Sequence, residues 1–143
     1  MDSIQINNGL KRIAVNGDEN RVIEFNPEDI VFVEKFYGLI KEFEQKEVEL
    51  RQRADEINAV EGVDAYGIPV NTAENIKLVI DLCQYLRVQI DKVFGTGTSQ
   101  KAFGEARTLS MFEQFFNGIM PFIQGAREEK VKEDPAVRAV RRD

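Results

Sequence analysis

The stretch RVIEFNPEDIVFVEKFYGLI (residues 21–40) carries a strand pattern into a helix pattern. Asn26 is a residue type that caps helix N-termini, and Pro27 suits the first helical position because it has no backbone N–H to satisfy. Glu28 and Asp29 add negative charge at the positive end of the helix dipole. The stretch therefore predicts a strand that ends just before Asn26 and a helix that begins at Pro27.

Upstream of this junction the sequence predicts a β-hairpin. Two strand-like runs, LKRIAV (10–15) and RVIEF (21–25), flank the turn signal Asn16-Gly17. Two isoleucines alternate with polar side chains in residues 3–7, which are a candidate third strand. An isolated hairpin is only marginally stable in water, so we expect this one to pack on a helix or to pair with another chain.

The first helix is predicted to extend from Pro27 to about Asn58, since no proline interrupts the pattern. Its apolar side chains form one heptad-like seam, interrupted by Glu47. The seam consists of Val33, Phe36, Ile40, Phe43, Leu50, Ala54 and Ile57. A helix of about 32 residues is roughly 48 Å long, whereas a domain of this size has a radius of gyration of about 14–15 Å. We therefore expect its distal part to project, or to lie against a second long helix or another subunit.

A second long helix follows the connector at residues 61–70, where glycine and proline break the helical pattern. Asn71 and Glu74 fit a capping box at its start, and Gly95 marks its end. The apolar residues between them recur at helical spacing: Ile76, Val79, Ile80, Cys83, Leu86, Ile90 and Val93. This helix is long enough to pair antiparallel with the distal half of the first, so the sequence predicts a long helical hairpin.

The remaining sequence is predicted to form a loop, a third helix and a charged tail. Residues 95–107 are rich in glycine and small polar residues. We expect an interhelical loop rather than a phosphate-binding loop, because they follow a helix and lack the P-loop spacing. Thr108 or Ser110 begins the third helix, and Pro121 is expected to kink or end its regular part. The charged residues 128–143 are typical of a flexible tail.

The predicted fold class is α+β, mainly α. An N-terminal β-hairpin, with a candidate third strand, precedes three helices, of which the first two form a long antiparallel helical hairpin. Residues 1–127 are expected to form a single α+β domain, and residues 128–143 the charged, flexible C-terminal tail.

Composition excludes several classes of function. The formal net charge is −6 and the isoelectric point is near 4.9, so the chain lacks the basic stripe that nucleic-acid binding requires. The absence of histidine excludes the Ser-His-Asp triad, the Cys-His pair and the common imidazole zinc sites. We therefore expect no enzymatic activity, no cofactor and no metal. Cys83 lies on the apolar seam of the second helix and is expected to be a small buried hydrophobe.

The expected location is the cytoplasm. The N-terminal residues contain no apolar segment typical of a secretory signal. No apolar run approaches the roughly 20 residues that cross a bilayer, so we expect no contact with membranes. A single cysteine suits a reducing compartment.

The strongest candidates for a binding site are the large apolar residues on and near the third helix. They are Phe103, Phe112, Phe115, Phe116, Met120 and Phe122. Phe112, Phe116 and Met120 share one helix face, and the adjoining stripe is also aromatic. So broad an apolar surface is more than one helix contact usually requires. Two interpretations stay open: the helix is the centre of the core, or part of this face is a groove or oligomer surface for apolar client segments.

Three stretches carry a resemblance to a known family: residues 21–40, IDKVFGTGTSQKAFGE (90–105) and MFEQFFNGIMPFI (111–123). In this order and spacing the chain resembles a family of small proteins from phages and prophages of Gram-positive bacteria. Its size and acidic, helical character are similar to those of phage tail-assembly chaperones. The resemblance implies an oligomer in the host cytoplasm that coats hydrophobic parts of the tape-measure protein and recruits tail-tube subunits. The implied partners are the tape-measure protein, the major tail protein and further copies of the chain.

Two other functions are compatible with the sequence. The chain is either a structural tail or virion protein, whose hairpins pair edge to edge to build a ring, or a phage-encoded inhibitor that binds a host protein. A chaperone would be absent from finished particles, whereas a structural protein would remain in them. An inhibitor would be dispensable for tail formation.

Overall fold

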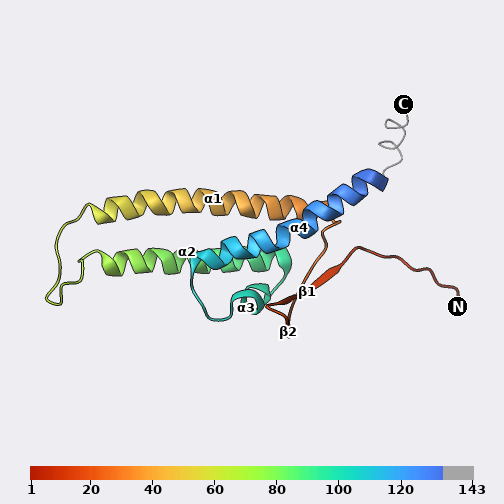
Figure 1. Cartoon of the computed structure of the whole chain (residues 1–143), viewed down its shortest axis with the longest axis horizontal. Coiled ribbons are helices and arrows are strands. Elements are labelled where there is room, and N and C mark those ends of the chain that lie inside the picture. The colour runs from red at the N-terminus through yellow and green to blue at the C-terminus, as the bar shows by residue number, and fades with distance from the viewer. Residues whose placement is uncertain (134–143) are drawn as a thin grey trace, which may run out of the picture.

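The computed structural model describes the backbone of residues 1–133 and shows a β-hairpin followed by helices, which confirms the predicted fold class. The elements in chain order are β1 (Lys11–Val15), β2 (Asp18–Phe25), α1 (Ile30–Asn58), α2 (Thr72–Phe94), α3 (Thr98–Phe103) and α4 (Leu109–Glu133). The molecule is elongated: α1 and α2 lie side by side, and the hairpin, α3 and α4 gather toward one end (Figure 1). The predicted long helical hairpin is therefore present.

The β-hairpin has two antiparallel strands, with Ile13 opposite Ile23. Asn16 and Gly17 turn the chain at φ values of 53° and 73°, the positive pair that an Asn-Gly turn favours. The predicted third strand at residues 3–7 is wrong, since the sheet contains only β1 and β2. The side-chain amide of Asn26 donates a hydrogen bond to the carbonyl of Asn8, which directs the preceding residues away from β1.

The first helix begins three residues later than the sequence suggests, and the predicted cap at Asn26 is wrong. Asn26 instead accepts a hydrogen bond of 3.0 Å from the backbone N–H of Glu28, which closes a local turn around the buried Pro27. The cap is Asp29, whose carboxylate accepts from the backbone N–H of Val31 at 3.0 Å. Asn26 and Asp29 are both of cap-forming type, and the turn at Asn26-Pro27 leaves Asp29 as the cap.

Hydrogen bonds of an asparagine side chain join the end of α1 to the start of α2. The Asn71 side chain makes no capping hydrogen bond, so the predicted capping box does not form. Its amide donates instead to the carbonyl of Ile57 at 3.2 Å and to the side chain of Asn58 at 2.7 Å. Asn71 thus links the end of α1 to the start of α2. The end of α2 at Gly95 is as predicted, with a φ of 120° and a backbone N–H that donates to the Asp91 carbonyl.

Residues 95–107 are not wholly a loop, because they contain the short helix α3. Gly97, at a φ of 89°, precedes this helix, and the carboxylate of Asp91 accepts from the Ser99 backbone N–H at 2.8 Å and from its hydroxyl at 3.2 Å. The glycines therefore mark the boundaries of the helix. The Ser99 N–H binds a carboxylate of α2, which agrees with the expectation that this segment is a connection rather than a phosphate-binding loop.

The last helix passes through Pro121 and continues to Glu133, so proline does not end it. The predicted boundary between domain and tail at residues 127 and 128 consequently falls inside α4. The remainder of the predicted tail, residues 134–143, lies outside the described residues.

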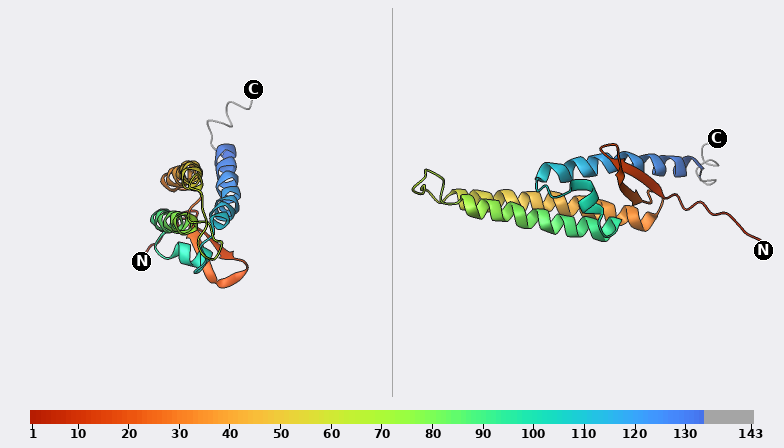
Figure 2. Two further views of the ribbon diagram at one scale, coloured as in Figure 1. Left: turned by 90° about the vertical axis from the view of Figure 1, so that its left-hand side faces the viewer. Right: turned by 90° about the horizontal axis from the view of Figure 1, so that it is seen from below.

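The core lies where the hairpin, α3 and α4 meet the two long helices. Its buried apolar residues are Ile23, Phe25, Val33, Phe36, Leu39, Phe43, Leu82, Cys83, Leu86, Ile90, Phe103, Phe112, Phe115, Phe116, Ile119 and Ile123. In contrast, no side chain of residues 44–81, all of which the structure describes, is fully buried. We call this segment the arm; two views agree that only α1 and α2 form its helical part (Figures 1 and 2).

Candidate functional site

Four of the six predicted binding residues lie in the core. Phe103, Phe112, Phe115 and Phe116 are each at most 9% exposed. Their rings join α3 and α4 to the long helices. For example, the ring centres of Phe103 and Phe112 are 4.9 Å apart, and those of Phe116 and Phe43 are 5.4 Å apart. Phenylalanine pairs at these separations add to the energy of simple burial. In the single chain these four residues are therefore packing residues with little surface for a client.

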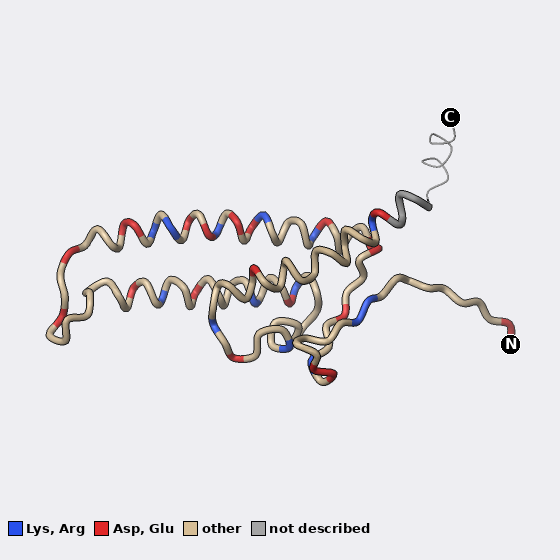
Figure 3. The backbone as a smooth tube through the Cα atoms, viewed as in Figure 1, with Lys and Arg blue, Asp and Glu red and all other residues tan. Residues whose placement is uncertain are grey.

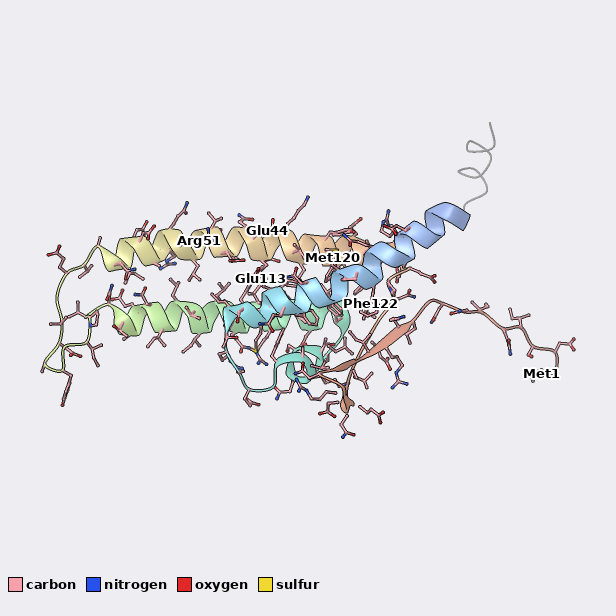
Figure 4. All side chains as sticks on the ribbon, viewed as in Figure 1. Met1, Glu44, Arg51, Glu113, Met120 and Phe122 are labelled. Atoms are coloured by element: carbon pink, nitrogen blue, oxygen red, sulfur yellow. The ribbon has the colours of Figure 1, made fainter. Side chains whose placement is uncertain are left out.

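The other two predicted residues lie at the rim of the core. Met120 and Phe122 are partly buried and project from the middle of α4 (Figure 4). The ring of Phe122 packs edge-on against Phe25 at 6.0 Å, and the ammonium group of Lys11 lies 5.2 Å from its centre. The positive charge of Lys11 is attracted to the face of the Phe122 ring in a cation–π interaction. The structure thus brings all six residues together in one largely aromatic cluster. Of the six, only Met120 and Phe122 are appreciably exposed to solvent.

The sequence analysis missed a different apolar surface, on the arm. The side chains of Ile76 and Ile80 are 54% and 48% exposed, and Val79 lies between them, partly buried. Together with Asn75 and Arg107 they line an open hollow, which we call the arm groove. Arg107 lies two residues before the start of α4, so the groove adjoins the part of α2 that α4 does not cover.

The arm groove is a continuation of the core seam without its third helix. Farther along α2, Cys83, Leu86 and Ile90 follow on the same seam and are each 0% exposed. At helical spacing, Ile76 and Ile80 continue that seam toward the tip of the arm. The helical spacing of Ile76 and Ile80 is visible in the sequence, but it predicted a contact with the first helix alone. That pairing uses only part of an apolar stripe that is wide enough for two helical neighbours.

Polar contacts cross the opposite flank of the helical hairpin, beside a second hollow lined by Leu50, Leu82 and Tyr85, among others. The ammonium group of Lys46 lies 5.0 Å from the centre of the Tyr85 ring and 3.5 Å from the carboxylate of Glu49. The Tyr85 hydroxyl donates a hydrogen bond to the carboxylate of Glu42. This flank therefore lacks the continuous apolar character of the arm groove.

Charged side chains cover the outer surface of the arm. Acidic residues outnumber basic ones along it (Figure 3). They include Glu44 on α1. Glu44 and Arg51 occupy the outer side of α1 (Figure 4). The arm thus combines an apolar groove with a mostly acidic exterior.

The one cysteine of the chain, Cys83, lies in the core. Cys83 is fully buried, as predicted, and burial raises the pKa of its thiol, which disfavours the reactive thiolate. In the part of the chain that the structure covers, no group of three or more His, Cys, Asp or Glu side chains could hold a metal ion. None of the described helices is long and apolar enough to cross a membrane.

A comparison with protein families identifies the chain. The model of a family of unknown function, DUF6673, matches residues 17–142. The chain belongs to the DUF6673 family. The matched residues begin at the hairpin turn and include α1, α2, α3 and α4, together with the arm groove. No curated protein and no solved structure matches this DUF6673 protein.

Proposed function

We propose that this DUF6673 protein is a non-enzymatic phage tail-assembly chaperone that binds apolar helical segments of the tape-measure protein. The observation that carries the proposal is the arm groove, an apolar stripe on α2 that α4 does not cover. The resemblance of residues 21–40, 90–105 and 111–123 to small phage proteins supplies the identity of the client.

A helical client segment would complete a three-helix bundle along the arm. An amphipathic helix docks in such a groove through side chains at i, i+3, i+4 and i+7. Burial of Ile76 and Ile80 would each contribute about 1 kcal/mol, roughly half the value for a fully exposed side chain, because both are already half-buried. Association costs several kcal/mol in lost freedom of motion, so the single groove gives weak, reversible binding. Reversibility suits a chaperone that leaves before the particle is complete.

The acidic exterior would keep the complex in solution. An apolar client segment on its own exposes a surface that favours aggregation. With its apolar face in the arm groove, the client would be flanked by the charged side chains of the arm, which repel other complexes of the same net charge. The partly exposed rim at Met120 and Phe122 is a second contact surface for tail subunits such as the major tail protein.

Co-expression with the tape-measure protein of the same phage tests the proposal. We expect a soluble complex by size-exclusion chromatography with light scattering. Ile80→Asp, which places a charge in the arm groove, should abolish the complex. Gln52→Asp adds the same charge to an exposed site on α1, away from the groove, and should leave the complex intact. Equal loss of binding in both variants, or insoluble client with the wild-type protein, would refute the proposal. Circular dichroism would verify that Ile80→Asp stays folded.

A structural role is the second candidate, favoured by the free edge of β1. Strand edges pair readily with other chains, and repeated pairing can close a ring. The amount of the protein in purified virions distinguishes the two functions. A fixed number of copies per particle supports the structural role, whereas absence from mature particles supports the chaperone.

A further inference from the structure

One edge of the β-hairpin is held by the rest of the molecule, and the other edge is open. Arg21 of β2 donates hydrogen bonds to the carbonyls of Lys101 at 2.8 Å and Ala102 at 2.9 Å, which fastens β2 to α3. Among the described residues, β1 pairs with no strand but β2. The outward backbone groups of β1 are therefore available to a further strand.

An apolar hollow of about 250 Å³ lies against the hairpin near its turn. On the hairpin side it is lined by Ile13, Ala14 and Val15 of β1, by Asn16 of the turn and by Ile23 of β2. Ile23 lies opposite Ile13, so the hollow covers one face of the hairpin and includes most of β1. On the helical side it is lined by Phe103, Phe115 and Ile119, among others. We call this hollow the hairpin groove.

The N-terminal segment has the pattern of a strand but no partner in its own chain. Ile4 and Ile6 are 82% and 80% exposed, and they alternate with Gln5 and Asn7. Such alternation gives a strand one apolar face. Residues 3–7 match the 5-residue length of β1. Among the residues that the structure describes, none covers the apolar face that Ile4 and Ile6 give to this segment.

The chain leaves β1 in a direction that leads this segment away from the strand (Figure 1). The carbonyl of Asn8 is held by the side-chain amide of Asn26. Gly9 has a φ of 83° and lies so close to Glu28 that a Cβ atom there would collide with the Glu28 side chain. The segment therefore extends away from the body of the molecule rather than along the open edge of β1 (Figure 1).

We propose that residues 3–7 of one copy add as a strand to β1 of a second copy, with Ile4 and Ile6 in the hairpin groove. Backbone hydrogen bonds would supply affinity, and the two isoleucines would supply specificity, as in other strand additions. Each copy donates one segment and accepts one, so reciprocal exchange would close a two-fold dimer, whereas head-to-tail exchange would generate a ring or a filament. This assembly is independent of the client that the arm groove binds.

Size-exclusion chromatography with light scattering of the full-length protein tests strand addition. We expect the wild type to form an oligomer and the double variant Ile4→Asp/Ile6→Asp to elute as a monomer of 16.3 kDa. The thermal unfolding of the monomer should be unaffected, because both side chains are already exposed. Gln5→Asp places its charge on the opposite face of the segment and should preserve the oligomer. A monomeric wild type, or an oligomer that persists in the double variant, would overturn the proposal.

Disulfide trapping checks which surfaces meet. An Ile6→Cys chain is mixed with a Val15→Cys chain that carries a size tag, and the mixture is oxidised. Since Cys83 is buried, it should not react. We expect a disulfide-linked pair of one tagged and one untagged chain, several-fold more abundant than the pairs formed by either chain alone. Equal amounts of all pairs would show random collision and contradict strand addition.

Discussion

The guanidinium group of Arg87 lies 5.5 Å from the centre of the Phe103 ring and donates hydrogen bonds to the carbonyls that follow this ring. The acceptors are Gly104 at 2.6 Å and Ala106 at 2.8 Å. Arg87 thereby fixes the connection from α3 to α4 on the side of α2. This connection sets where α4 begins, and hence where the arm groove starts.

Arg87→Met should lower the free energy of unfolding by about 2–3 kcal/mol, because charge-assisted hydrogen bonds to two carbonyls are lost. Burial, and the nearby cation of Arg107, lower the pKa of Arg87 below its ordinary value, although arginine stays charged at neutral pH. Urea unfolding at pH 7 measures the difference. Arg87→Lys should recover only part of it, since an ammonium group cannot match the geometry of both acceptors. An unchanged unfolding midpoint in Arg87→Met would contradict this role.

The core and the arm should respond differently to the same kind of substitution. Phe116→Ala should cost about 3–5 kcal/mol, because Phe116 is 5% exposed and packs against several rings. Ile80→Ala should cost about 1 kcal/mol or less, since Ile80 is 48% exposed. Chemical denaturation of both variants provides the comparison. Similar losses would mean that the arm groove is covered in solution.

Pro121→Ala should stabilise the protein. Pro121 is exposed in the interior of α4 and cannot donate the hydrogen bond that the carbonyl of Asn117 would otherwise accept. Alanine restores that donor, so we expect a gain of up to about 3 kcal/mol. The thermal unfolding midpoint reports the change. A lower midpoint would indicate that α4 depends on the proline ring.

Cys83 should resist thiol reagents in the folded protein. Burial raises the pKa of its thiol above the ordinary 9.0, so the folded state contains less thiolate at a given pH than the unfolded state does. Reaction with a disulfide reagent at pH 8 should be at least about 100-fold slower than in urea, because it requires opening of the core. Fast labelling without denaturant would contradict the burial of α2 against the core.

Much of the fold could be predicted from local patterns. The Asn16-Gly17 turn and the glycine at the end of α2 each allow few backbone conformations, so their positions were predictable. The start of α1 was not, because Asn26 and Asp29 are both good caps and only the packing of Pro27 distinguishes them. A competing turn of this kind depends on tertiary contacts.

The candidate site was harder to predict than the fold. Periodicity identified the apolar stripes of α2 and α4, but it does not reveal which neighbour covers each stripe. The aromatic residues, represented by Phe115, are covered by the chain itself, whereas Ile80 remains open because α4 starts too late to cover it. That difference depends on the point where α4 begins, which Arg87 fixes through long-range contacts.

Photo-crosslinking from position 80 tests the central claim most directly. A photoreactive phenylalanine analogue is placed at Ile80 in one variant and at Gln52 in another, and each is irradiated in cells that assemble phage tails. The account predicts a covalent adduct with the tape-measure protein from position 80 and none from position 52. If position 80 yields no such adduct, or if both positions yield it equally, then the arm groove is not the docking site for the client.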